Sequence, residues 1–344
     1  MDTSYLIKIK KEVRLFLIIT FVITFSMGLV MFFALKNNNE IDAGAFGLVQ
    51  MFYPALAAII AKIYYDKENI PKDLRKFFNI YIGISVIAVG VLTLGIFVFP
   101  TKTTSVLNGF IMIVSVITFI MIIIGQDTSY EKISMVFTKN FKTVAVLSLL
   151  FVGLKIIMIL FSGFIYGGLP EVLKELMPKI IVAIVTLPLV VIFSFIIFFG
   201  EELGWREYLQ VRLQILFGKK IGVIILGFIW GIWHLPLCFM LYSPATPIYC
   251  VITHVFFCIF LGIFLGFVYM KTKSLWSVMI IHSINNSIAV SANNGEYAQV
   301  ITSMDLIWGV IICAIVFLPF IFTKEYKGEI KATQWNKEVS NIES

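Results

Sequence analysis

Apolar stretches of about 20 residues recur along the chain, and this is the length that a helix needs to cross a bilayer. Short polar segments separate them. The pattern therefore predicts an all-helical, polytopic transmembrane bundle of about ten spanning helices. The predicted spans are Leu15–Leu35, Phe46–Tyr65, Phe78–Phe99, Val106–Ile124, Val144–Tyr166, Ile180–Phe199, Ile221–Met240, Ile248–Met270, Leu275–Val290 and Leu306–Phe322.

Three parts of the chain need a separate interpretation. The first span follows four basic residues, as in a signal peptide, but it is long and lacks a cleavage site, so we expect a retained helix. The stretch Leu169–Lys179 contains Pro170 and Pro178 and is predicted to be a short interfacial segment before the sixth span. A loose polar tail is expected from Lys324 onwards.

The basic residues are distributed unevenly over the polar segments. With a cytoplasmic N-terminus, 21 of the 27 Lys and Arg residues fall in cytoplasmic segments and 4 in external ones. The remaining two, Lys155 and Arg206, lie within the apolar zone. Because Lys and Arg collect in cytoplasmic loops, the bias predicts that both termini are cytoplasmic.

Composition excludes other classes of protein. Hydrophobic residues make up 60% of the chain and charged residues only 14%. So few charged residues cannot cover the water-exposed surface of a soluble enzyme. The net charge of +7 is spread between apolar stretches rather than gathered on one face, so no nucleic-acid partner is expected. The four cysteines lie in or beside apolar segments and are interpreted as small apolar fillers, with a Cys238–Cys250 bridge as the alternative.

Three glutamates interrupt the apolar sequence after the sixth predicted span. Ionisable residues beside hydrocarbon cost about 2.5–3.5 kcal/mol each and indicate function. Glu202 and Arg206 are four residues apart, so they share a helical face and can neutralise each other. If the cytoplasmic boundary of the membrane lies near Arg212, Glu201 lies about 16 Å inside the membrane at 1.5 Å per residue. The alternative is that the helix ends at Gly200 and the glutamates are solvated.

Two histidines reach a similar depth on two other helices. From the cytoplasmic ends of their spans, His234 lies about 20 Å deep and His282 about 12 Å deep. Gly227 and Gly231 share the face of His234 and would let another helix approach, and Pro236 would kink or end this helix. Asn286 is four residues after His282, in a polar stretch that packing alone does not need.

The third histidine, His254, is interpreted differently, as a satisfied hydrogen-bonding residue between helices. The other groups suit hydrolysis of an acyl or peptide bond. A carboxylate and a neutral imidazole can deprotonate water, and a second imidazole with a carboxamide can stabilise an oxyanion. Two alternatives stay open at this point. Zinc could bind two histidines and a glutamate, and buried Glu and His residues also suit a proton relay in a transporter.

The three motifs together resemble the CPBP family of intramembrane proteases, which includes CAAX prenyl proteases and the Abi bacteriocin-processing enzymes. The sequence EELGWR at 201–206 matches EExxxR, Trp230 to His234 matches FxxxH with Trp in place of Phe, and His282 to Asn286 matches HxxxN. The resemblance covers roughly Ile180–Val290. It says nothing about the first four spans, which have few polar interruptions and are interpreted as scaffold. The predicted division is therefore 1–168, N-terminal transmembrane scaffold helices; 169–300, a CPBP/Abi-type protease core; 301–323, the last transmembrane helix; and 324–344, a cytoplasmic tail.

The resemblance also implies a role for each motif residue. Catalytic residues would be Glu201 and His234, which activate water, and His282 and Asn286, which stabilise the oxyanion. Glu202, Arg206 and Trp230 would shape the site, and Arg206 could also meet a substrate carboxylate. No cofactor is expected. If zinc is used, its ligands would be Glu201, His234 and His282.

The resulting prediction is an intramembrane endopeptidase acting on a membrane-associated, prenylated or leader-bearing peptide or protein. The alternatives are an inactive membrane scaffold or bacteriocin-immunity protein of the same fold, and a proton-coupled transporter. Against transport, no matching pair of interrupted helices appears in the first half of the chain. The 23 Lys against 4 Arg, with abundant Ile and Phe, are typical of a low-GC bacterium and favour a bacterial cell membrane.

Overall fold

The computed structural model describes residues 3–38, 40–125, 128–136, 140–292 and 297–328, which contain helices and no strand. The predicted all-helical fold class is confirmed. The helices are α1 (Thr3–Asn37), α2 (Gly44–Gln50), α3 (Tyr53–Asp66), α4 (Lys72–Val98), α5 (Thr103–Ile124), α6 (Thr128–Glu131), α7 (Phe141–Ile165), α8 (Leu169–Phe193), α9 (Phe195–Glu202), η3 (Leu203–Gln210), α10 (Val211–Phe217), α11 (Lys219–Trp233), α12 (Leu235–Leu237), η4 (Cys238–Tyr242), α13 (Pro247–Thr272), α14 (Leu275–Ala292) and α15 (Ser303–Phe317). Short 3₁₀ segments are η1 (Lys67–Asn69), η2 (Pro100–Lys102), η5 (Leu318–Phe322) and η6 (Lys324–Tyr326).

Among the described residues, eight helical segments are long and apolar enough to cross a membrane, and a bent pair, α11 with α12 and η4, adds a ninth. Large apolar side chains such as Phe97, Phe164 and Val185 are more than two thirds exposed on the outside of the bundle, where lipid would cover them. The chain is therefore an integral, multi-pass membrane protein. The stretch predicted as the ninth span, Leu275–Val290, is helical but more polar than these segments, because His282 and Asn286 lie within it.

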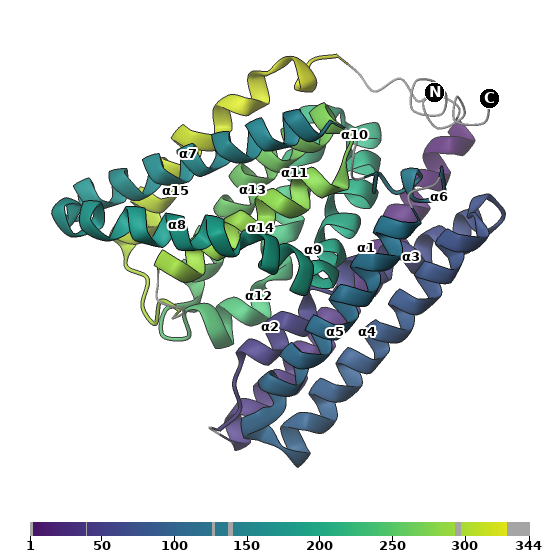
Figure 1. The fold of residues 1–344 in the computed structure, drawn as a ribbon, viewed down its shortest axis with the longest axis horizontal. Coiled ribbons are helices and arrows are strands. Elements are labelled where there is room, and N and C mark those ends of the chain that lie inside the picture. The colour runs from purple at the N-terminus through teal and green to yellow at the C-terminus, as the bar shows by residue number, and fades with distance from the viewer. Residues whose placement is uncertain (1–2, 39, 126–127, 137–139, 293–296, 329–344) are drawn as a thin grey trace.

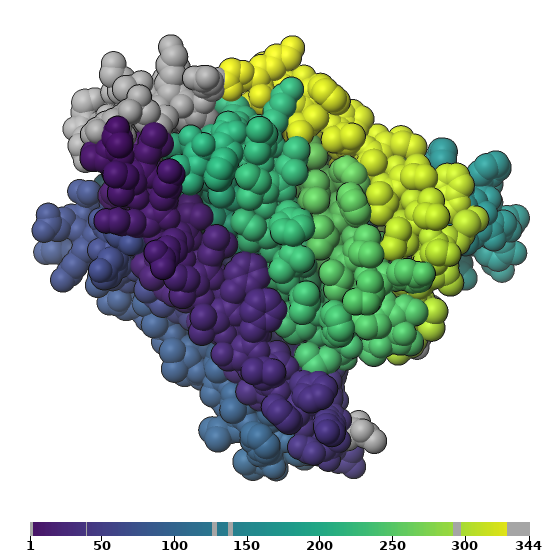
Figure 2. All heavy atoms as spheres, turned by 180° about the vertical axis from the view of Figure 1, so that it is seen from behind, coloured from purple at the N-terminus to yellow at the C-terminus, as the bar shows by residue number. Residues whose placement is uncertain are grey.

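The helices form two groups that meet at α9 and η3 (Figure 1). One group contains α1 to α5, and the other contains α7, α8, α11, α13, α14 and α15. Seen from behind, α1 crosses the molecule diagonally and lies beside the segments that follow residue 200 (Figure 2). The N-terminal helices thus pack directly on the segment that carries the glutamate pair.

The basic segments assigned to the cytoplasm meet at one end of the bundle. Lys8, Lys62, Lys132, Arg212 and Lys273, from five such segments, line one cavity of about 760 Å³. Their common location agrees with the prediction, made from the charges, that successive loops lie on alternate sides of the membrane. That this end faces the cytoplasm stays a prediction.

Two boundary predictions are wrong. Leu169–Lys179 is the start of α8 rather than an interfacial segment, and the helix runs through Pro178 and Pro188. Pro170 fits the first turn of a helix, and neighbouring helices make interior prolines tolerable in membrane proteins. The predicted span Ile180–Phe199 is broken at Ser194, where α8 ends and α9 begins.

The C-terminal segment differs from its prediction, whereas the cysteines agree with theirs. Residues 329–344 lie outside the described part, but the predicted loose tail already fails at Tyr326, whose buried hydroxyl donates a 2.7 Å hydrogen bond to the Ile263 carbonyl. All four cysteines are buried and free, as expected of apolar fillers. The alternative Cys238–Cys250 bridge is not formed.

Glycines bring α11 against α13, as predicted from the spacing of Gly227 and Gly231. A Cβ atom on Gly231 would lie 2.6 Å from the Cα atom of Val255, and one on Gly227 would lie 2.4 Å from the Cα atom of Ile259. Since both obstacles are backbone atoms, a side chain here would force the two helices apart. This close contact fixes the position of His234 at the end of α11 relative to α13.

We expect Gly231→Ala to lower the free energy of unfolding by about 1–3 kcal/mol, the range typical of overpacking. The measurement is thermal unfolding of the purified protein in detergent. Gly153→Ala is the control, because no atom lies within 4 Å of its added Cβ and alanine is the better helix former. Equal unfolding temperatures for the two variants would contradict the close contact of α11 and α13.

Candidate active site

The three motifs come together from four segments of the chain. Glu201 and Glu202 end α9, Arg206 lies on η3, and His234 lies at the break after α11. His282 and Asn286 are one turn apart on α14, which packs against α9. Glu202 and His282, which are 80 residues apart in sequence, therefore meet in one buried polar cluster.

Glu202 is the centre of this cluster and has no exposed surface. Its Oε2 accepts a 3.1 Å hydrogen bond from Arg206 Nε, which is the ion pair predicted from their spacing. Its Oε1 accepts a 2.7 Å hydrogen bond from His282 Nδ1. Both carboxylate oxygens are therefore occupied by charged or polar donors, and Glu202 is committed to joining η3 to α14.

Glu201 has a different environment from its neighbour. It is only 4% exposed, and its Oε2 accepts a 3.1 Å hydrogen bond from Trp230 Nε1. The hydrogen bond that Glu201 makes among the described residues is to this oxygen, and its Oε1 accepts none there. Of the two adjacent carboxylates, Glu201 is the one with an oxygen free to accept a proton.

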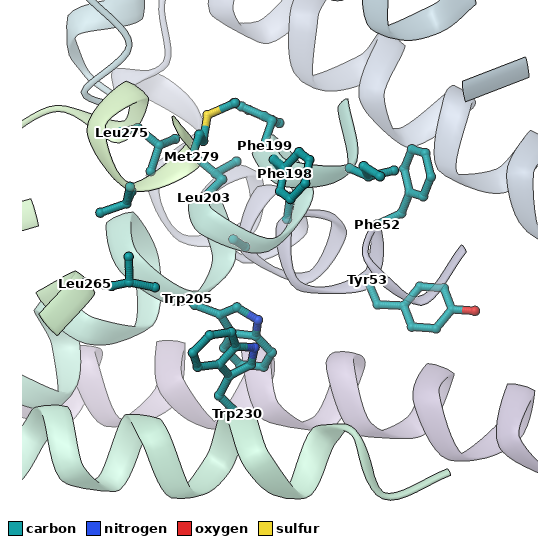
Figure 3. Packing of buried hydrophobic residues seen from close by; sticks show 14 of the residues in the cluster. Phe52, Tyr53, Phe198, Phe199, Leu203, Trp205, Trp230, Leu265, Leu275 and Met279 are labelled. Atoms are coloured by element: carbon teal, nitrogen blue, oxygen red, sulfur yellow. The ribbon is translucent and has the colours of Figure 1, made fainter. Parts of the chain in front are cut away.

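Trp230 connects the three motifs through its ring. The indole lies 5.8 Å from the His282 ring and 6.1 Å from the His234 ring, measured between centroids. The Arg206 guanidinium lies 4.6 Å from its centroid, a cation–π contact. Figure 3 shows Trp230 rising from its helix toward the segment that carries Trp205. The tryptophan at this position thus supplies both an aromatic wall and the donor to Glu201.

The bend at the end of α11 fixes the orientation of His234. The helix stops at Trp233, and the following pair α12 and η4 departs at 43°, as expected from Pro236. His234 Nδ1 lies 2.9 Å from the Trp230 carbonyl oxygen. Because a carbonyl can only accept, Nδ1 carries the proton and Nε2 of the neutral ring keeps its lone pair.

Asn286 is at the edge of the cluster and is half-buried. Its Oδ1 accepts a 3.0 Å hydrogen bond from Asn285 Nδ2, which leaves the Asn286 amide hydrogens available as donors. Arg206 is completely buried, and its two terminal nitrogens have no hydrogen-bond partner in the described ranges. Its predicted contact with a substrate carboxylate, like the catalytic roles of the other residues, stays a prediction.

The zinc ligand set implied by the family resemblance, Glu201, His234 and His282, stays a prediction. Within the described ranges, the group whose ligand atoms all lie within 4.8 Å of one another is His234, His254 and Cys258. His254 is also not the satisfied residue that was predicted, because its Nε2 is buried without a hydrogen-bond partner.

Two contacts made by the N-terminal helices were not predicted from the sequence. Gln50 on α2 donates a 2.9 Å hydrogen bond to the Trp233 carbonyl, which the break in α11 leaves free. Lys62 on α3 pairs with Glu207 at 2.9 Å. The available signal was the presence of two polar residues inside an otherwise apolar predicted span, Phe46–Tyr65.

The chain is thus a helical membrane protein that contains a buried cluster of glutamate, histidine and asparagine residues. Residues 183–288, which contain all three motifs, match the family model of type II CAAX prenyl endopeptidase Rce1-like proteins. The family resemblance predicted from the motifs is confirmed over this region, and the match supports a CAAX-type protease. No curated protein and no solved structure matches the chain significantly.

We expect Glu202→Gln to lower the free energy of unfolding by about 3 kcal/mol or more, because it leaves Arg206 buried without its counter-charge. Chemical unfolding in detergent measures this change. Glu175→Gln is the control. Glu175 pairs with Lys179 at 2.8 Å on the same spacing, but its side chain is 62% exposed, so its replacement should leave stability nearly unchanged. Similar losses in both variants would contradict the buried role of Glu202.

Proposed function

We propose that the chain is an intramembrane endopeptidase that hydrolyses a peptide bond of a membrane-associated peptide or protein. The proposal rests mainly on the different hydrogen-bond partners of the two adjacent glutamates. Arg206 and His282 occupy both oxygens of Glu202, whereas Glu201 has one oxygen held by Trp230 and one free. The match to CAAX-type proteases supports the same class of reaction.

In the proposed mechanism, a water molecule binds between the free oxygen of Glu201 and Nε2 of His234. Glu201 takes a proton from the water as the hydroxide oxygen bonds to the scissile carbonyl carbon. The carbonyl π bond breaks and its electrons move to the oxygen. The oxyanion electrons then re-form the carbonyl π bond as the carbon–nitrogen bond breaks, and the leaving nitrogen takes the proton back from Glu201.

His282 and the Asn286 amide would stabilise the developing oxyanion. His282 donates Nδ1–H to Glu202, so its Nε2 can donate to an oxyanion only when the ring is doubly protonated. Charge balance supports that state. Two carboxylates and the Arg206 guanidinium leave one negative charge in a water-poor cluster, and an imidazolium would neutralise it. Donors that are already in place cost no reorganisation as the oxyanion forms.

This mechanism needs no metal ion. The glutamate and the two histidines have separate hydrogen-bond partners, and the group that converges within ligand distance excludes both Glu201 and His282. We therefore favour a glutamate-dependent peptidase. The proposed substrate is a prenylated or leader-bearing peptide or protein, and the Lys-rich composition favours the bacterial cell membrane as the location of the enzyme.

The proposal is tested by comparing membrane peptides from cells that carry the wild-type protein with those from cells that carry Glu201→Gln. We expect peptides that are cut in the first sample and intact in the second, because glutamine still accepts the Trp230 hydrogen bond but cannot take a proton. Glu175→Gln is the control and should give the wild-type peptides. Identical peptides in all three samples would favour an inactive scaffold or immunity protein instead.

A further inference from the structure

A cluster of metal-binding side chains lies where α11 meets α13. His254 and Cys258 are four residues apart and share a face of α13. The ring of His234 lies 4.3 Å from that of His254 between centroids. The contact is enforced by Gly231, whose close approach to Val255 holds the end of α11 against this turn of α13.

All three residues offer an available donor atom. One ligand atom from each lies within 4.8 Å of the other two, so the three could hold a single ion. His254 Nε2 is buried and has no hydrogen-bond partner in the described part of the chain. Cys258 is a free thiol with 1% of its surface exposed. A buried imidazole nitrogen without a partner is costly unless something else satisfies it.

His234 is also oriented as a metal ligand would be. Metal-bound histidines almost always donate their second ring N–H to a carbonyl or carboxylate, which fixes the tautomer. His234 does so through Nδ1 to the Trp230 carbonyl at 2.9 Å. Its remaining nitrogen, Nε2, therefore has a lone pair in a fixed direction.

The donor set selects the kind of ion. Two imidazoles and a thiolate are soft or borderline ligands, which suit zinc and exclude calcium and magnesium, because those ions need oxygen ligands. Three protein ligands leave the fourth position of a tetrahedral zinc ion for water. The thiol must lose its proton when the zinc–sulfur bond forms, and that proton passes to the medium.

We propose that His234, His254 and Cys258 form a zinc-binding site that holds the peptidase inactive. The inhibitory part rests on the proposed function, because it assumes that His234 Nε2 helps to bind the hydrolytic water. A zinc–nitrogen bond uses that lone pair. Glu201 is not part of the ligand group, so the ion would compete with the water-activating pair rather than complete it.

Zinc binding is tested directly on purified, metal-free protein in detergent. Cobalt(II) serves as the spectroscopic probe, since zinc is spectroscopically silent. We expect one equivalent to bind, with an intense thiolate-to-cobalt absorption band, and zinc to displace it. Cys258→Ser should abolish the band and weaken zinc binding by more than the roughly 10–100-fold typical of losing an outer-shell partner.

Two further variants make this experiment decisive. Cys313→Ser is the matched control, because it also replaces a buried free thiol but lies on α15 outside the cluster, and it should bind cobalt as the wild type does. His254→Gln tests the site independently should Cys258→Ser fold poorly, and it should weaken binding while leaving the thiol in place. Equal affinity in the wild type and His254→Gln, or no binding by the wild type, would overturn the site.

Inhibition is tested with the peptide that the membrane comparison identifies. We expect zinc to stop cleavage by the wild type, whereas His254→Gln stays active and resists zinc. Loss of activity in His254→Gln, restored by excess zinc, would overturn inhibition and indicate a catalytic ion. Glu201→Gln separates the two proposals, because it should lose cleavage but bind cobalt normally. A wild type that binds zinc but cuts nothing even when it is metal-free would leave the site standing and refute the peptidase.

Discussion

The buried carboxylate of Glu202 is the constraint on which the site depends. Taking one charge out of water costs several kcal/mol, and only well-placed partners offset this cost. Arg206, one turn along η3, and His282 on α14 supply both partners. Because the two partners come from different segments, satisfying Glu202 ties η3 to α14. Glu201 is then left facing Trp230, with one oxygen unused.

Close helix packing completes the arrangement around this charge cluster. A Cβ on Gly204 would lie 2.4 Å from Pro54 Cβ, so η3 sits directly on α3, just as Gly231 sets α11 on α13. Irregular helix is concentrated at the same places. The π-helical segment η3 follows the glutamates, η4 follows His234, and π-helical turns often occur at functional sites. The N-terminal helices, which looked like plain scaffold, contribute Gln50 to the carbonyl exposed by the bend.

Features that depend on local spacing could be predicted from the sequence. The Glu202–Arg206 pair, the bend before Pro236 and the close approach at Gly227 and Gly231 all follow from helical periodicity or from proline chemistry. Features that depend on which helices are neighbours could not be predicted. The His254 environment is set by the end of α11, more than 20 residues away in sequence, so it gave no local signal. The unbroken α8 shows the opposite error, since prolines that end soluble helices are tolerated between packed helices.

The most direct test of the central claim is a double-mutant cycle between Glu202 and His282, with free energies of unfolding measured for Glu202→Gln, His282→Leu and the double variant. A hydrogen bond to a charged group contributes about 1.5–3 kcal/mol, so the account predicts a coupling energy of that size. Effects that add to within about 0.5 kcal/mol would show that the two residues act independently. That result would contradict a site organised around Glu202.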